Sequence, residues 1–237
     1  MTTITSHDNA KLKEIRKLTQ RRRDRERLGR FVAEGEDLLA AADAAGWHPV
    51  HRFCAAGSGL PGTEVAPPLL SQASGIASGA RAVAVYEERW APAAVGTLCV
   101  YLHGVRDPGN VGTILRSASA FGAGSVVLGP GSADPYSPKA VRASMGAVFE
   151  VPLARTADVS GLPGTKVALV ADAGVPLAEV KLSGPMTLLV GSERDGLPAA
   201  VVESADVAAR IPIRSHSLNA AMAATVALYE GSRMARR

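Results

Sequence analysis

The stretches Leu98-Cys99-Val100-Tyr101-Leu102 and Asp107-Pro108-Gly109-Asn110-Val111-Gly112 decide the fold class of this chain. The first is an apolar run of strand length, and the second is a glycine-containing turn that opens a helical pattern over residues 110–121. The same order recurs through a strand at 125–128, a helix opened by Pro138, strands at 167–171, 187–190 and 207–211, and a last helix at 217–230. This alternation predicts an α/β fold with a mostly parallel sheet that helices cover on both faces.

The N-terminal part predicts a smaller α/β/α unit. Ser6 is a candidate N-cap for a helix that runs on from Asp8. Strands are expected at 30–34, 50–55 and 81–86, and helices at 35–46 and 69–77. The Pro- and Ala-rich residues 90–96 read as a linker, so the predicted domains are 1–95 and 96–237.

Composition bounds the class of protein. Of the 237 residues 47% are hydrophobic, which is ample for a core, and no apolar run is long enough for a membrane span. Cys54 and Cys99 lie in apolar strand-like runs without metal-ligand spacing, so we expect buried thiols in a reducing compartment. The first residues lack the basic and apolar regions of a signal peptide, and a cytoplasmic location is predicted.

Positive charge is concentrated near the N-terminus. The net charge is only +4, yet ten lysines and arginines lie between Lys11 and Arg30, against Glu14, Asp24 and Glu26. Such a segment is either an ordinary solvated helix or a surface for a nucleic-acid backbone. We favour the second interpretation, in which the segment from Lys11 to Arg30 binds the phosphate backbone of a nucleic acid.

Three polar clusters follow apolar runs in the C-terminal half. They are Asp107 to Gly112 with Arg116, Gly191-Ser192-Glu193-Arg194-Asp195-Gly196, and Ile211-Pro212 with Ser217-Leu218-Asn219. Ligands of open α/β sheets bind beyond the carboxyl ends of the strands, so the three clusters are expected to form one site.

Each cluster also has a purely structural interpretation. Asn110 and Ser217 are possible helix caps, and Glu193 is a possible cap for a helix after Pro198. Gly191 would let a ligand approach the backbone closely. The first cluster has no G-x-G-x-x-G dinucleotide fingerprint, and the chain has no G-x-x-x-x-G-K-[ST] phosphate loop, which argues against a nicotinamide or nucleotide triphosphate site there.

In this order and spacing the clusters resemble the three motifs of the TrmH/SpoU family of RNA 2'-O-ribose methyltransferases, in the SPOUT superfamily. Residues 98–230 resemble the SPOUT domain, and Arg142-Ala143-Ser144-Met145-Gly146-Ala147 matches a stretch common in the family. Residues 30–87 resemble the L30e-like substrate-binding domain that rRNA-modifying members carry. The resemblance implies a deep trefoil knot and a homodimer with its site at the subunit interface.

The resemblance also assigns residues. It implies that Asn110, Arg116, Glu193, Ser217 and Asn219 are the catalytic set, and that S-adenosylmethionine is the cofactor. The residues implied to hold the cofactor, largely through their backbone, are Leu189, Val190, Gly191, Ile211, Pro212, Leu218 and Asn219. No metal is expected. The chain between Pro212 and Ser217 is shorter than usual in the family.

The resemblance leaves the role of Arg116 and the substrate open. Arg116 is sometimes assigned as the base in such enzymes. We instead expect it to hold a substrate phosphate and stabilise the developing oxyanion, because a guanidinium stays protonated. Ribosomal RNA is the predicted substrate because of the N-terminal domain. The alternatives are a tRNA 2'-O-methyltransferase and a non-catalytic RNA-binding protein of the same fold.

Overall fold

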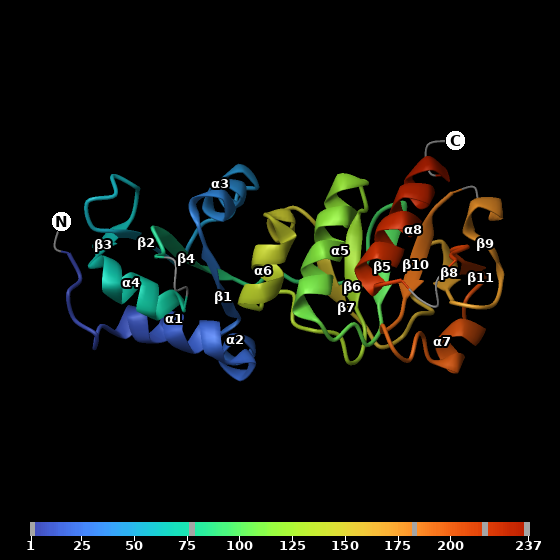
Figure 1. Cartoon of the computed structure of the whole chain (residues 1–237), viewed down its shortest axis with the longest axis horizontal. Coiled ribbons are helices and arrows are strands. Elements are labelled where there is room, and N and C mark those ends of the chain that lie inside the picture. The colour runs from blue at the N-terminus through green and yellow to red at the C-terminus, as the bar shows by residue number, and fades with distance from the viewer. Residues whose placement is uncertain (1–2, 76–78, 182–183, 215–217, 235–237) are drawn as a thin grey trace. The chain divides into compact units, whose positions relative to one another are not determined.

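The computed structural model of the chain describes residues 3–75, 79–181, 184–214 and 218–234 (Figure 1). It divides into two compact units. Unit 1 comprises residues 1–88 and 134–149, and unit 2 comprises residues 89–133 and 150–237.

Unit 1 is built on a four-stranded sheet in the order β1 (Arg30–Glu34), β4 (Ala82–Glu87), β2 (His51–Ala55) and β3 (Thr63–Val65). The first two pairings are antiparallel, and β2 pairs with β3 in parallel. The helices are α1 (Ala10–Gln20), α2 (Arg22–Leu28), α3 (Glu36–Ala44) and α4 (Pro67–Ser74). Leu12, Ile15 and Leu18 form the buried face of α1 and join a core with residues of the sheet and α4.

Two details of unit 1 differ from the sequence prediction. Asn9, not Ser6, caps α1, because the Asn9 side chain accepts hydrogen bonds from the backbone N–H groups of Lys11 and Leu12. The Ser6 hydroxyl instead accepts one from the N–H of Asp8, which closes a turn before the helix. Strand β3 was not predicted, since three residues are too few to show an alternating pattern.

Residues 134–149 pack with unit 1, although the predicted boundary near residue 95 places them in the C-terminal domain. This segment contains α6 (Pro138–Ser144) and the 3₁₀ helix η1 (Ala147–Phe149). Tyr136 and Phe149 lie against the ring of Phe31, at centroid distances of 4.5 and 5.9 Å. The turn after α6 needs Gly146, whose φ is 97° and whose added Cβ would lie 2.7 Å from that of Ala41.

Unit 2 contains a seven-stranded sheet whose pairings are all parallel. The order is β7 (Leu153–Arg155), β6 (Ser125–Leu128), β5 (Leu98–Leu102), β10 (Met186–Val190), β8 (Thr165–Leu169), β11 (Val207–Arg210) and β9 (Val175–Pro176). The α/β class with a parallel sheet is therefore confirmed. The short strands β7 and β9 were not predicted.

Helices cover both faces of this sheet. Helices α5 (Pro108–Ala120) and α8 (Ala220–Met234) pack side by side on one face (Figure 1). Gly231 allows α8 to lie close to β5, because a Cβ added at this position would be 2.9 Å from Cδ1 of Leu98. On the other face, Tyr101, Ala168 and Leu189 pack with residues of α7 (Ala199–Glu203), while the 3₁₀ helix η2 (Leu177–Glu179) follows β9. The parallel strands place their carboxyl ends at one edge, where the polar clusters begin.

Two further predictions concern burial and membranes. Cys54 and Cys99 are both buried free thiols, as expected. Among the described residues, no helix combines the length and the apolar character needed to cross a membrane.

Candidate functional site

The first polar cluster is fixed by the start of α5. The Asp107 carboxylate caps the helix by accepting hydrogen bonds from the N–H groups of Gly109, at 2.6 Å, and Asn110, at 3.1 Å. Pro108 fills the first helical position, where no N–H is needed. The cap is therefore Asp107, and the side chain of Asn110 is left for another role.

The three predicted clusters meet through side-chain hydrogen bonds. Nδ2 of Asn110 donates a short hydrogen bond to the Glu193 carboxylate. Nδ2 of Asn219 donates to Oδ1 of Asn110 at 3.2 Å. Asn110 is thus linked to Glu193, 83 positions away, and to Asn219, 109 positions away, in one chain of hydrogen bonds, Asn219–Asn110–Glu193.

These contacts show which side chains of the clusters act as helix caps. No side chain caps α7 after Pro198, and Glu193 is directed to Asn110 instead. Oδ1 of Asn219 caps α8 by accepting from the N–H groups of Ala221 and Met222, so Asn219 serves the helix and the cluster together. Ser217, the predicted cap and catalytic residue, lies outside the described residues.

The loop after β10 is closed on itself. Ser192 and Gly196 pair through two backbone hydrogen bonds of 3.1 Å, and the N–H of Asp195 donates to the Ser192 hydroxyl at 3.0 Å. A Cβ added to Gly191 would lie 2.2 Å from the backbone carbon of Gly196. Gly191 is therefore needed so that the loop can fold back on its own backbone, whereas the sequence had suggested a close approach by a ligand.

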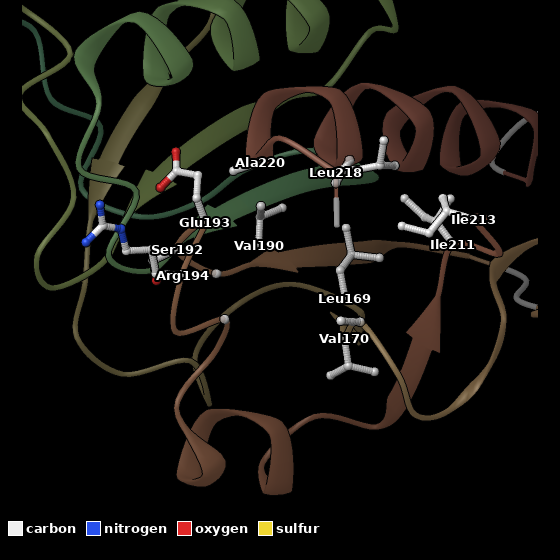
Figure 2. Close-up of a pocket in the computed structure, with 14 residues that line it drawn as sticks. Leu169, Val170, Val190, Ser192, Glu193, Arg194, Ile211, Ile213, Leu218 and Ala220 are labelled. Carbon is white, nitrogen blue, oxygen red and sulfur yellow. The ribbon is translucent and has the colours of Figure 1, made fainter. Parts of the chain in front are cut away.

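An apolar pocket of about 260 Å³ lies at the carboxyl ends of β8, β10 and β11 (Figure 2). Its lining residues are Leu169, Val170, Ala171, Val190, Gly191, Ser192, Glu193, Arg194, Gly196, Ile211, Ile213, Leu218, Ala220 and Ala223. Figure 2 shows the apolar side chains facing one another across the pocket, with the charged groups of Glu193 and Arg194 at one end. The pocket can enclose a flat apolar group and leave a polar end beside Glu193.

A polar pocket of about 610 Å³ adjoins the first and shares Ser192, Glu193 and Arg194 with it. Its other lining residues are Gly104, Arg106, Asp107, Asn110, Asp195 and Asn219. The Asn219–Asn110–Glu193 chain therefore lies in the wall of the polar pocket, and Glu193 borders both spaces.

The predicted cofactor residues do not all line the apolar pocket. Val190, Gly191, Ile211 and Leu218 do, whereas Asn219 lines the polar pocket and Leu189 is fully buried in the core beneath α7. Pro212 lines neither pocket. Sequence reasoning missed Leu169, Val170 and Ala171, although they end a predicted strand and the rule that found the other clusters applies to them.

Arg116 lies apart from the other predicted catalytic residues. It is exposed on α5, opposite the buried stripe that contains Val111, Ile114 and Leu115, and it lines neither pocket. Among the described residues of a single chain, the site therefore lacks Arg116, the arginine of the first cluster. In that same part, no three His, Cys, Asp or Glu side chains gather to hold a metal ion.

Comparison with known proteins identifies the family to which this chain belongs. Residues 97–229 match the SpoU rRNA Methylase family, and residues 9–91 match the MRM3-like substrate binding domain. The chain belongs to the SpoU rRNA Methylase family. The predicted resemblance is thereby confirmed over both parts of the chain.

Two relatives of this SpoU family member carry names that specify ribosomal RNA. The 23S rRNA (guanosine(2553)-2'-O)-methyltransferase RlmP of Bacillus subtilis is 38% identical over 133 residues, which are 53% of this chain and 54% of that protein. The chain thus matches about half the length of this curated relative. The crystal structure of an AdoMet-bound rRNA methyltransferase from Sinorhizobium meliloti is 33% identical, with a TM-score of 0.87 over 98% of this chain and 97% of that one.

A tRNA-related structure is similar to a smaller part of this chain. This structure, described by the 2-OH methylation of C/U34 on tRNA, is 29% identical, covers 58% of this chain and 89% of that one, and has a TM-score of 0.52.

Proposed function

We propose that this protein transfers the methyl group of S-adenosylmethionine to a ribose 2'-hydroxyl of ribosomal RNA. The observation that carries this proposal is the position of Glu193, which borders both the apolar pocket and the polar pocket and is held by Asn110. Because Glu193 borders both pockets, a group bound in one pocket lies next to a group bound in the other. Membership of the SpoU family supports the same reaction.

The apolar pocket fits the adenosyl part of the cofactor. Leu169, Val170, Ile211 and Leu218 offer an apolar enclosure for an aromatic ring, and the strand-end backbone offers polar groups for its edge. When bound, S-adenosylmethionine supplies an electrophilic methyl group on a sulfonium. The protein's part is to align this group with the hydroxyl and to exclude water.

In the polar pocket, Glu193, Asn110 and Asn219 would position the ribose. The hydrogen bonds between them fix the Glu193 carboxylate, so that it can accept a hydrogen bond from a ribose hydroxyl. Ser217, which lies outside the described residues, is proposed to take part on the family resemblance alone. The hydroxyl proton would leave to a phosphate oxygen or to water, because the arginine of the motif set stays protonated.

Arg116 is proposed to act in the site of a second subunit. It is exposed and lines neither pocket of its own chain, so a homodimer would bring the Arg116 guanidinium to the partner's site. Met222, Val226 and Tyr229 of α8 form an exposed apolar stripe beside α5, with exposed fractions of 54%, 40% and 48%. This stripe supports α8 as part of the dimer interface. The trefoil knot of the SPOUT fold is proposed on family membership alone.

The basic segment of unit 1 is proposed to bind the RNA backbone. Its lysines and arginines differ in whether they are exposed and whether they already pair within the chain. Arg25 is buried in an ion pair with Asp134, so it cannot contact RNA. Lys13, Arg22, Arg27 and Arg30 pair with nearby carboxylates, and Arg16 donates to the carbonyl of His7. The remaining cations are exposed and have no ion pair among the described residues. They are Lys11, Lys17, Arg21 and Arg23.

Ribosomal RNA is favoured over tRNA by the extent of the similarity. The rRNA methyltransferase structure matches both units, whereas the tRNA-related structure covers 58% of the chain. The substrate-binding domain of unit 1 has a counterpart in the MRM3-like family. A cytoplasmic location is proposed with this substrate.

The proposal is tested by incubating the purified protein with S-adenosylmethionine and deproteinised rRNA or tRNA, followed by mass spectrometry of the nucleosides. We expect 2'-O-methylnucleosides in rRNA, and we expect the reaction to continue in EDTA. Glu193→Ala should abolish them. Glu179→Ala, which lies outside both pockets, is the matched control. Methylation of tRNA alone, or of a base rather than a ribose, would contradict the proposal.

A further inference from the structure

Two arginines of the polar pocket have no role in the reaction described above. Arg106 directly precedes Asp107, the cap of α5, and Arg194 lies in the closed loop after β10. Both are exposed and both line the polar pocket. Within the described residues, neither side chain makes a hydrogen bond or an ion pair. Their donors are therefore available to a ligand.

The charged groups of the pocket bear on how it could accept RNA. The other charged groups of the wall are Asp107, Glu193 and Asp195. Each carboxylate accepts a hydrogen bond within the chain. A wall with three carboxylates alone would repel a polyanion. Arg106 and Arg194 place two positive charges at the same surface.

The backbone that carries each arginine is held in place. Arg194 lies between Ser192 and Gly196, which pair through two hydrogen bonds. Near Arg106, the N–H of Gly104 donates to the carbonyl of Pro130 at 2.9 Å, and the carbonyl of Val105 accepts from Ala133 at 2.8 Å. Figure 2 shows the Arg194 guanidinium on the side of the Glu193 carboxylate, away from the apolar side chains.

We propose that Arg106 and Arg194 bind the phosphate groups that flank the target ribose, and so place that ribose against Glu193. The proposal rests on the proposed function and adds to it two substrate-binding residues of the chain's own pocket. A planar guanidinium with paired donors suits a phosphate, and fixed backbone on both sides lowers the cost of ordering the side chains.

The test compares Arg106→Gln, Arg194→Gln and the double variant with Lys181→Gln. Lys181 is an exposed cation of unit 2 that lines neither pocket, so its replacement removes the same charge elsewhere. Binding of a deproteinised 23S rRNA transcript is measured between about 50 and 200 mM salt. The slope of log K against log salt is negative for RNA binding. Each arginine variant should reduce its magnitude by about 0.7 to 0.9, which corresponds to roughly four- to sixfold weaker binding at 0.15 M salt.

Two further readouts separate a phosphate contact from other roles. Calorimetry should show wild-type affinity for S-adenosylmethionine in every variant. Arg106→Lys and Arg194→Lys should keep the salt slope, since the charge remains, but should raise the RNA KM, since the paired donors are lost.

Three results would overturn the inference. They are an unchanged slope in the double variant, an equal loss of slope in Lys181→Gln, and a loss of cofactor affinity in Arg194→Gln with RNA binding intact. Failure of the proposed function is a separate result, because the wild-type protein would then bind the transcript without methylating it.

Discussion

The buried ion pair between Arg25 and Asp134 gives a sharp prediction about unit 1. Nε of Arg25 lies 2.7 Å from Oδ2 of Asp134, and both side chains are only 6% exposed. Arg25 also donates to the carbonyl of Leu18 at 2.6 Å, and Asp134 accepts from the N–H of Tyr136 at 2.8 Å. The pair joins α2 to the 134–149 segment, so its loss should loosen that segment from the rest of unit 1.

Removing one partner leaves an uncompensated buried charge. Asp134→Ala should lower the free energy of unfolding of unit 1 by about 3–5 kcal/mol. Arg25→Met should cost a similar amount, although Met keeps most of the apolar stem. The double variant Arg25→Met with Asp134→Leu should recover most of the loss, because two apolar side chains of similar size replace both charges.

Trp47 provides the assay. It is buried in unit 1, where its indole N–H donates to the carbonyl of Phe149, and the second tryptophan, Trp90, belongs to unit 2. Urea unfolding followed by fluorescence in a Trp90→Phe background therefore reports on unit 1. A neutral Asp134→Ala, or a double variant as unstable as the single ones, would refute this reasoning.

Three other predictions concern the site and one titrating group. Arg116→Ala should slow methylation by about 100-fold with unchanged cofactor affinity. Mixing it in equal amounts with Glu193→Ala, under conditions that allow subunits to exchange, should restore about a quarter of the wild-type rate, because half of the dimers are then mixed and each has one intact site. No recovery would argue against a shared site. Gly191→Ala should weaken cofactor binding by roughly five- to 150-fold, since the added Cβ would displace the Gly196 backbone that lines the pocket and such overpacking costs about 1–3 kcal/mol. Gly161→Ala, in open space, should not, and calorimetry compares the two. Burial raises the pKa of Glu34 above its ordinary 4.5, against opposing effects of Ser74 and Arg142. This group therefore favours folding in acid and loses that contribution as the pH rises through its folded pKa. Glu34→Gln should raise stability at neutral pH relative to wild type, and the gain should vanish below about pH 4; a gain that does not change with pH would contradict this.

Strong local patterns made much of the fold predictable. The bounds of the strands at residues 30–34, 98–102 and 125–128 agree with the prediction, because each is a full apolar or alternating run between turn residues. The positions of the three polar clusters followed from the same reading, and the structure joins Asn110, Glu193 and Asn219 through hydrogen bonds. Strand ends and motif order were enough to place these side chains near one another.

Features that depend on tertiary contacts were not predictable. No local pattern shows that residues 134–149 pack with unit 1, or that Arg25 turns inward among ten basic residues. The choice of Asn9 over Ser6 as a cap depends on where the apolar face of α1 meets the core. The need for Gly191 depends on Gly196, whose backbone lies against it in the folded loop.

The most direct test of the central claim is the chemical position of the transferred methyl group. S-adenosylmethionine with a tritiated methyl group is incubated with the protein and deproteinised rRNA, and the RNA is then hydrolysed in alkali. A 2'-O-methyl group blocks cleavage of the neighbouring phosphodiester, so we predict that the label will appear in alkali-resistant dinucleotides and will be absent with Glu193→Ala. Label found in mononucleotides would place the methyl group on a base and would contradict the account.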